Sequence, residues 1–173
     1  MNNKVLQSIL AMFRARGYPE VPAELAPLPQ WTEIEYLATP TVVVLVSPGS
    51  LKKTVAKRMI ECMEESFQTR QSRLVVGNGG SRQAIACLQE AGIEFVPLSL
   101  LSFDRSVHSL VPSYRILSPP EKVALLHTYS TCELDWPKIF LSDPQVVYTG
   151  ARLGDILHNI SDNIFRVVIA APV

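Results

Sequence analysis

The first hundred residues alternate between continuous apolar runs and segments whose apolar residues recur at helical spacing. The apolar runs lie at 41–46, 74–76 and 93–98. The helical patterns lie between them, at 51–67 and 81–91. An unbroken apolar run is typical of a strand that is covered on both faces. The order strand, helix, strand, helix, strand with short links therefore predicts an α/β unit with a parallel or mixed sheet and right-handed crossovers.

Another helix is predicted before this unit, and glycines are placed to end the helices. The first helix has a stripe of Leu6, Ile9, Leu10 and Phe13, and Gly17 follows it. A proline-rich connector comes next, with Pro19, Pro22, Pro27 and Pro29. The helix at 51–67 should pack through Val55, Met59, Met63 and Phe67, and Gly92 should end the helix at 81–91.

The last third begins with a helix-start signal. In Ser118-Pro119-Pro120-Glu121, the serine can cap the first turn and Glu121 can complete a capping box. Proline costs little at the first helical position because its missing N–H has no helical partner there. The next apolar residues recur on one face and predict a packed stripe of Val123, Leu126 and Tyr129, broadened by Leu125.

Short elements follow this helix. The segment 136–141 predicts a short extended strand, and the proline near its start fits either a sheet edge or the entry to a strand. Asp143-Pro144 repeats the cap-plus-proline pattern, and Gly150 should end a short helix in a left-handed conformation. Strands are predicted at 154–157 and 165–169, joined by the turn residues Ser161-Asp162-Asn163.

Composition narrows the class of protein. The chain has 173 residues, 47% of them hydrophobic, which is enough for one ordinary domain or two small ones. Lys+Arg and Asp+Glu both total 16, so bulk charge does not indicate a nucleic-acid-binding module. The separated cysteines Cys62, Cys87 and Cys132 form no C-x-x-C pair. They predict buried reduced thiols, which suit the cytosol or nucleus.

Candidate chemistry is sparse. The loop from Gly77 to Ser81 follows a strand and opens a helix, so a phosphate could bind there, although it lacks the P-loop lysine and the dinucleotide-binding pattern. A tight turn capped by Ser81 is the competing interpretation. In Glu94-Phe95-Val96, valine stands where a metal-dependent nuclease would need lysine.

Two further groups of polar residues could be functional. His108, His127 and His158 have no evident nucleophile partner. The cations Lys52, Lys53, Lys57 and Arg58 gather at a helix start, where they form either a solvated face or a contact for DNA phosphates.

The last third has a distinctive order of residues, which is His108, Leu110, Val111, Pro112, Leu117, Ser118, Glu121, Lys122, Pro137, Lys138, Ile139, Asp143, Pro144, Tyr148, Gly150 and Gly154. Their order and spacing over 108–157 resemble the assembly domain of the fifth common subunit of eukaryotic nuclear RNA polymerases, a family with an archaeal relative that lacks the jaw domain. Arg16-Gly17-Tyr18 at the end of the first helix resembles the end of the helix that begins the same family's jaw domain.

This resemblance implies a fold, a function and partners. It implies a restriction-endonuclease-like jaw domain at 1–104 without nuclease activity, and a small mixed-sheet assembly domain with two short helices at 105–173. The chain would be a non-catalytic polymerase subunit without a cofactor. It would dock on the largest subunit and lie beside downstream DNA, with transcription factors as further partners. The docking residues would be His108, Leu110, Val111, Pro112, Asp143, Pro144, Tyr148 and Gly150, and the residues near DNA would be Lys52, Lys53, Lys57 and Arg82.

The chain also departs from the family pattern. Leu153 replaces a usual basic residue, the turn near 161–164 is short, and the connector at 19–40 is short. These departures predict a divergent paralogue, with a protist or a large DNA virus as its source. Its location would be the nucleus, including the nucleolus, or a virion or cytoplasmic factory if the source is viral. A small α/β nucleotide- or phosphate-binding protein that uses the loop from Gly77 to Ser81 is the alternative function.

Overall fold

The computed structural model describes residues 3–18, 26–28, 31–38, 41–67, 72–102, 108 and 110–170. The chain forms two compact units. Unit 1 comprises Met1–Arg14 and Tyr18–Asp104, and unit 2 comprises Ala15–Gly17 and Arg105–Val173. The chain is therefore a mixed α/β protein, and the assignment of unit 1 as a jaw domain stays a prediction.

Unit 1 is built on a mixed sheet of five strands in the order β1-β2-β3-β4-β5. The strands are β1 (Ala26–Leu28), β2 (Trp31–Ala38), β3 (Val42–Ser47), β4 (Ser72–Gly77) and β5 (Glu94–Pro97). The pairs β3–β4 and β4–β5 are parallel, as the alternation of strands and helices predicted. The strands β1 and β2 pair antiparallel with each other, β2 also pairs antiparallel with β3, and the sequence pattern did not indicate these two strands.

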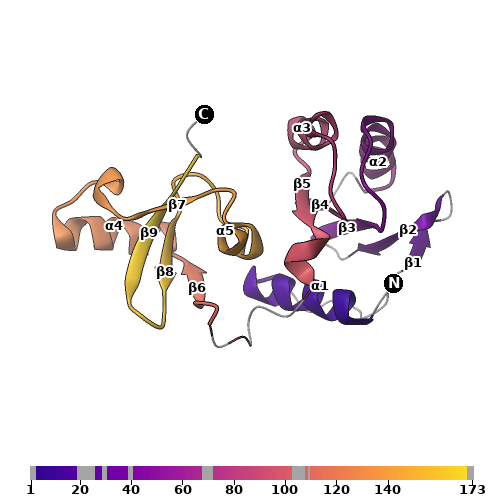
Figure 1. Cartoon of the computed structure of the whole chain (residues 1–173). Helices are drawn as coiled ribbons and strands as arrows, with labels where there is room; N and C mark the ends of the chain where they lie inside the picture. Colours follow the sequence, from indigo (N-terminus) through magenta and orange to yellow (C-terminus); the bar gives the residue numbers. More distant parts are fainter. Residues whose placement is uncertain are drawn as a thin grey trace. The chain divides into compact units, whose positions relative to one another are not determined.

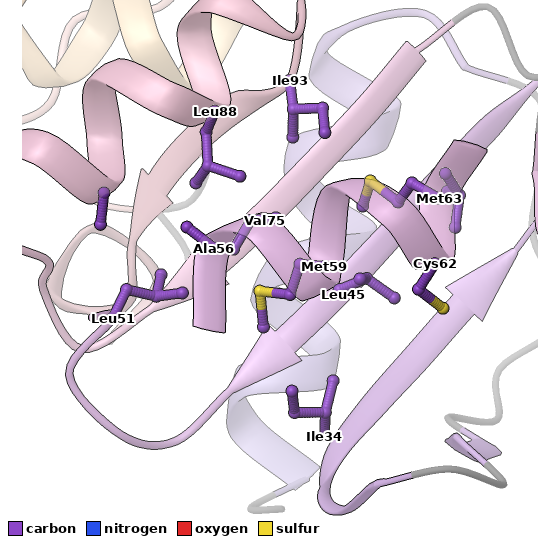
Figure 2. Close-up of a cluster of buried hydrophobic side chains, with 12 residues drawn as sticks. Ile34, Leu45, Leu51, Ala56, Met59, Cys62, Met63, Val75, Leu88 and Ile93 are labelled. Atoms are coloured by element: carbon purple, nitrogen blue, oxygen red, sulfur yellow. The ribbon is translucent and has the colours of Figure 1, made fainter. Parts of the chain in front are cut away.

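Helices cover both sides of this sheet. Figure 1 shows α2 (Lys53–Ser66) and α3 (Arg82–Glu90) on one side and α1 (Asn3–Ala15) on the other, and a short 3-10 helix, η1 (Leu98–Leu101), follows β5. All six residues of β3 are buried, as a strand covered on both faces requires. Met59 and Met63 of α2 are fully buried against the sheet and α3 (Figure 2). The predicted packing face of this helix is confirmed.

Two glycines end helices of unit 1 as predicted. The φ angles of Gly17 and Gly92 are +72° and +68°, in the left-handed region where side chains with a Cβ are strained. After Gly17, the Tyr18 N–H donates to the Phe13 carbonyl oxygen at 3.0 Å. The chain thus turns away from α1 while an otherwise unpaired carbonyl of its last turn gains a donor.

Unit 2 contains a smaller sheet in the order β6-β8-β9-β7. Its elements are β6 (Tyr114–Ile116), α4 (Pro119–Tyr129), the 3-10 turn η3 (Glu133–Asp135), β7 (Lys138–Phe140), α5 (Pro144–Thr149), β8 (Ile156–Asn159) and β9 (Ile164–Ile169). The strand β7 is parallel to β9, forms an edge of the sheet and begins just after Pro137, so both positions that the proline allowed are found. The sequence pattern did not indicate β6.

The two helices of unit 2 lie on opposite sides of its sheet (Figure 1). The side of α5 holds a compact apolar cluster formed by Val146, Ala151, Leu157 and Val168. By contrast, α4 buries none of its residues. The predicted packed stripe on α4 is wrong, because Val123 is 67% exposed and Tyr129 is 57% exposed, while Leu125 and Leu126 are only half-buried.

The structure also shows how far each cysteine is buried and whether potential metal ligands lie together. Cys62 is buried, and its burial, with a smaller contribution from Glu65, raises the pKa of its thiol. The prediction of buried thiols fails for Cys132, which is exposed, and only half holds for Cys87. Among the described residues, no cluster of His, Cys, Asp or Glu could hold a metal ion. No helix in this part of the chain has the length and apolar character to cross a membrane.

Candidate docking surface

Among the described residues, all the large apolar side chains that are exposed to solvent belong to unit 2. The described residues of unit 1 include no such side chain. Single exposed apolar residues are ordinary on a protein surface, but their concentration in one small unit makes unit 2 the candidate docking surface. The residues are Leu110, Ile116, Val123, Tyr129, Phe140, Leu141, Leu153, Ile160 and Ile164.

Part of this surface is a shallow apolar hollow on the outer side of α4. The lining of the hollow is mostly carbon. Val123 is one of the lining residues, and 67% of its surface is exposed. Neither a carboxylate nor a lysine or arginine lines the hollow. An uncharged apolar surface on another protein would fit it. The lining residues are Pro119, Pro120, Val123, Ala124, His127 and Thr128.

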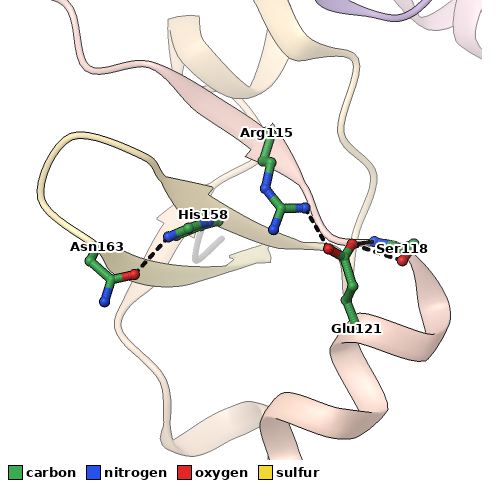
Figure 3. A network of polar contacts seen from close by, with 5 residues as sticks. All are labelled: Arg115, Ser118, Glu121, His158 and Asn163. Atoms are coloured by element: carbon green, nitrogen blue, oxygen red, sulfur yellow. Dashed lines mark hydrogen bonds and ion pairs between the residues drawn. The ribbon is translucent and has the colours of Figure 1, made fainter.

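Polar contacts at the start of α4 compensate for its lack of buried side chains. The Glu121 carboxylate accepts hydrogen bonds from the Ser118 N–H at 2.8 Å and from the Ser118 hydroxyl at 2.7 Å. It also forms an ion pair with Arg115 of β6 at 2.8 Å (Figure 3). The Ser118 N–H, then its hydroxyl and Arg115, lower the pKa of Glu121 to about 2. This network joins β6 to α4.

Lys122 makes a second set of attachments. Its ammonium group donates to the Gly154 carbonyl oxygen at 2.7 Å and forms an ion pair with Glu133 at 2.8 Å. These contacts join α4 to the segment before β8 and to η3. The adjacent residues Glu121 and Lys122 therefore attach the helix in different directions, which gives a physical role to the Glu-Lys pair at this position.

A row of ring contacts, two edge-to-face and one stacked, continues from the end of α4 across the sheet. The ring centroids of Tyr129 and Trp136 are 5.3 Å apart, and those of Trp136 and Phe165 are 5.6 Å apart. His158 then stacks on Phe165 with centroids at 4.5 Å. His158 Nε2 lies 2.9 Å from Asn163 Oδ1 at the β8–β9 turn (Figure 3). Aromatic packing, instead of an aliphatic core, thus fixes the far end of α4.

The predicted docking residues around α5 mostly shape the fold. Asp143 caps α5 by accepting a hydrogen bond from the Gln145 N–H at 2.8 Å, and Pro144 is the exposed first residue of the helix. Tyr148 is 3% exposed. Gly150 ends the helix with φ at +73°, as predicted. These residues can influence a partner mainly by holding the surface in shape.

The predicted residues before β6 lie closer to the surface. Leu110 is 85% exposed, and its N–H donates to Nδ1 of the exposed His108 at 3.2 Å. Val111 and Pro112 are half-buried and line a small hollow together with Tyr148. The structure therefore brings Val111 and Pro112, from the segment before β6, next to Tyr148 of α5.

The four cations predicted to lie near DNA are all exposed at the starts of α2 and α3. The chain segments that precede these helices are joined, because the Leu51 N–H donates to the Gly79 carbonyl oxygen at 2.8 Å. Neither helix has an acidic residue in its first turn or a basic residue in its last turn. Lysines at a helix start oppose the helix dipole, at a cost of about 0.3–1 kcal/mol each. The four cations are Lys52, Lys53, Lys57 and Arg82.

The loop from Gly77 to Ser81 has the bonds of a capped tight turn. The Ser81 hydroxyl accepts a hydrogen bond from the Ala84 N–H at 3.2 Å, and the Ser81 N–H donates to the Leu51 carbonyl oxygen at 3.0 Å. A Cβ on Gly77 would lie 3.0 Å from the Leu51 side chain. Close packing and helix capping therefore account for the small residues in this loop.

Sequence reasoning missed Arg115 and the outward direction of Val123. Arg115 lies on β6, which is only three residues long and has too little alternation to be recognised. The segment 119–129 has apolar residues on more than one side, and this was the available signal that Val123 and Leu125, two positions apart, could not both face one sheet.

Known proteins match this part of the chain. The family model described as RNA polymerase Rpb5, C-terminal domain, matches residues 103–162. The DNA-directed RNA polymerase subunit Rpo5 of Thermococcus onnurineus is 49% identical over 55 residues, which are 32% of this chain and 67% of the relative. The Rpo5 subunit of Pyrococcus horikoshii is 50% identical over 50 residues, which are 29% of this chain and 61% of the relative.

A more distant relative agrees with these. The Rpo5 subunit of Methanococcus vannielii is 38% identical over 52 residues, which are 30% of this chain and 67% of the relative. The matches thus define the class of protein as a subunit of DNA-directed RNA polymerase. Within that class, the chain belongs to the RNA polymerase Rpb5 family. Residues 1–102 lie outside the segment that the family model matches.

Proposed function

We propose that this chain is a non-catalytic structural subunit that docks through unit 2 on the largest subunit of a multisubunit RNA polymerase. The supporting observation is the concentration of exposed large apolar side chains in unit 2. Burying apolar surface contributes about 25 cal/mol for each Å² removed from water. A eukaryotic source would place the complex in the nucleus, with other polymerase subunits as further partners.

In this proposal, the docking residues act in two ways. Leu110 and His108 contact the partner directly, as does the α4 hollow around Val123, because these side chains are exposed. Asp143, Pro144, Tyr148 and Gly150 hold α5 and the adjoining segment in shape, and Val111 and Pro112 anchor the segment that presents Leu110.

Reconstitution with the largest subunit tests the docking. We expect Leu110→Asp and Val123→Asp each to reduce co-purification at least tenfold, because a carboxylate would be desolvated at the interface. Gln89→Asp on the exposed side of α3 in unit 1 is the matched control and should co-purify normally. Equal recovery of all three variants with the largest subunit would contradict docking through unit 2.

We propose, further, that unit 1 is a jaw domain that lies beside downstream duplex DNA through the starts of α2 and α3. The supporting observation is the placement of Lys52, Lys53, Lys57 and Arg82 at these helix starts, against the helix dipoles. Cations are retained there at a cost in stability, which favours a role in contacting phosphates. Any transcription factor that docks on unit 1 would share this exposed side.

Neutralising charges at the two ends of α2 tests the contact with DNA. In the reconstituted polymerase, Lys52→Gln with Lys53→Gln should weaken binding of downstream duplex and reduce its dependence on salt concentration. Glu64→Gln with Glu65→Gln, at the other end of the same helix, should not weaken it. If the two double variants behave alike, the start of α2 does not face the DNA.

The alternative function is binding of a nucleotide or phosphate at the loop from Gly77 to Ser81. The internal hydrogen bonds of this loop favour a structural turn. A thermal-shift series with ATP, GTP and inorganic phosphate separates the two functions, because a true ligand stabilises the folded chain by mass action. A concentration-dependent rise in Tm that Ser81→Pro abolishes would support the alternative.

A further inference from the structure

The dipeptide Ser-Pro occurs at two described positions of the chain, in contrasting environments. Ser47 precedes Pro48 at the end of β3 and is 8% exposed. Ser118 precedes Pro119 at the start of α4, is half-buried, and has extended backbone angles of φ −66° and ψ 156°. Proline-directed protein kinases require that the serine before the proline is accessible. Of these two described sites, Ser118 is the more accessible.

Ser118 stands between the polar attachment of α4 and its apolar hollow. The Ser118 hydroxyl donates to Glu121, which is paired with Arg115 (Figure 3). The next two residues, Pro119 and Pro120, line the hollow. A charge added to Ser118 would therefore affect both features at once.

We propose that Ser118 of the unassembled chain is a phosphorylation site for a proline-directed protein kinase, and that the phosphate prevents docking. The inference rests on the proposed docking of unit 2. In the reaction, the Ser118 Oγ attacks the γ-phosphorus of ATP, and an Oγ–P bond forms as the bond to ADP breaks. The hydroxyl proton passes to a base of the kinase or to water.

The phosphate would rearrange the charges at the start of α4. Phosphoserine carries a charge of about −1.5 to −2 at pH 7. It would compete with Glu121 for Arg115, because guanidinium binds phosphate in a bidentate manner. The Glu121 carboxylate is repelled by the new charge, while the helix start still receives a hydrogen-bond acceptor from the phosphate. The main consequence is a strongly hydrated dianion beside an apolar hollow that docking has to dehydrate.

Mapping the modified residues of the full chain tests the acceptor. After incubation with a proline-directed kinase and ATP, mass spectrometry should find phosphate on Ser118 and not on Ser47. Thr39→Ala in all samples removes the other proline-directed position, Thr39-Pro40, which lies outside the described residues. Peptides of residues 43–52 and 114–123 show that the kinase accepts both sequences when they are unfolded. Modification of the second peptide without modification of the folded chain at Ser118 would overturn the assignment.

Docking assays then test the consequence. The phosphorylated chain should bind the largest subunit at least tenfold more weakly than the unmodified chain, and treatment with the kinase should not change the binding of Ser118→Ala. Equal binding of phosphorylated and unmodified chains would overturn the regulation alone. Failure of the unmodified chain to bind would overturn the docking proposal and this regulation together, while the mapping still decides whether Ser118 is an acceptor.

Discussion

Unit 1 and unit 2 use different interactions to hold helices against a sheet. In unit 1, α2 and α3 bury methionine, leucine and alanine side chains against a sheet whose central strand is inaccessible. In unit 2, α4 buries no residue and is held by Glu121, Lys122 and a row of rings. The exposed apolar groups of unit 2 support the proposal that a partner covers it, whereas the described part of unit 1 exposes no large apolar side chain.

The largest predicted effect is in the core of unit 1. Met59 is fully buried, so Met59→Ala should lower the free energy of unfolding by about 2–5 kcal/mol, because it removes apolar contacts and leaves a cavity. Val123→Ala on α4 should change this free energy by less than about 0.5 kcal/mol, since its side chain is exposed. Urea unfolding of both variants measures the difference. Similar losses would remove the contrast between the two units.

The next effect concerns the end of α5. Gly150→Ala should destabilise unit 2 by about 1–2 kcal/mol, because a Cβ is strained at its left-handed φ. A methyl group added at Gly49 would meet no other atom within 4 Å, and the φ angle there is not positive, so Gly49→Ala in unit 1 is the matched control. Hydrogen exchange in unit 2 should accelerate for the first variant only. We also expect Gly150→Ala and Pro112→Ala to weaken assembly with the largest subunit more than they alter elongation.

A smaller effect is expected where Lys122 attaches α4. Lys122→Met keeps the length of the side chain and removes the hydrogen bond to Gly154 and the ion pair with Glu133. The loss should be about 1 kcal/mol, within the ordinary range for a single hydrogen bond. The amides of α4 should exchange faster while those of α5 do not change. Uniform acceleration across unit 2 would show that α4 is not separately attached.

The smallest effect depends on pH. Because the pKa of Glu121 falls from 4.5 to about 2 on folding, its contacts stabilise the fold fully above pH 4.5. This contribution is lost as pH falls toward 2, because protonation removes the charge that Ser118 and Arg115 stabilise. Glu121→Gln should abolish this part of the pH dependence, which acid titration of α4 amide signals by NMR measures. An unchanged titration in this variant would assign the effect to another group.

Local signals in the sequence predicted the elements whose ends are chemically marked. Ser118-Pro119, Asp143-Pro144 and Gly150 identified the helices of unit 2, because capping and left-handed turns require particular residue types. The buried strand β3 was equally clear, since both of its faces are apolar. These features depend on neighbours in the chain and need no knowledge of the tertiary structure.

The features that were missed depend on distant parts of the chain. β2 was overlooked beside the proline-rich connector, and β6 is a short strand that pairs with β8 about forty positions later. The outward direction of Val123 is set by Lys122 and Gly154, whose contact joins residues 32 positions apart. Periodicity identifies apolar positions, but only the tertiary structure decides which of them face the sheet.

The outer strand β7 has a consequence for the chain between its synthesis and its assembly. A sheet edge in a unit with so many uncovered apolar groups invites strand-to-strand aggregation. Pro137 has no N–H to offer another strand, and the exposed ammonium of Lys138 disfavours stacking of identical chains. The residues of this short strand therefore disfavour pairing of its free edge with another chain.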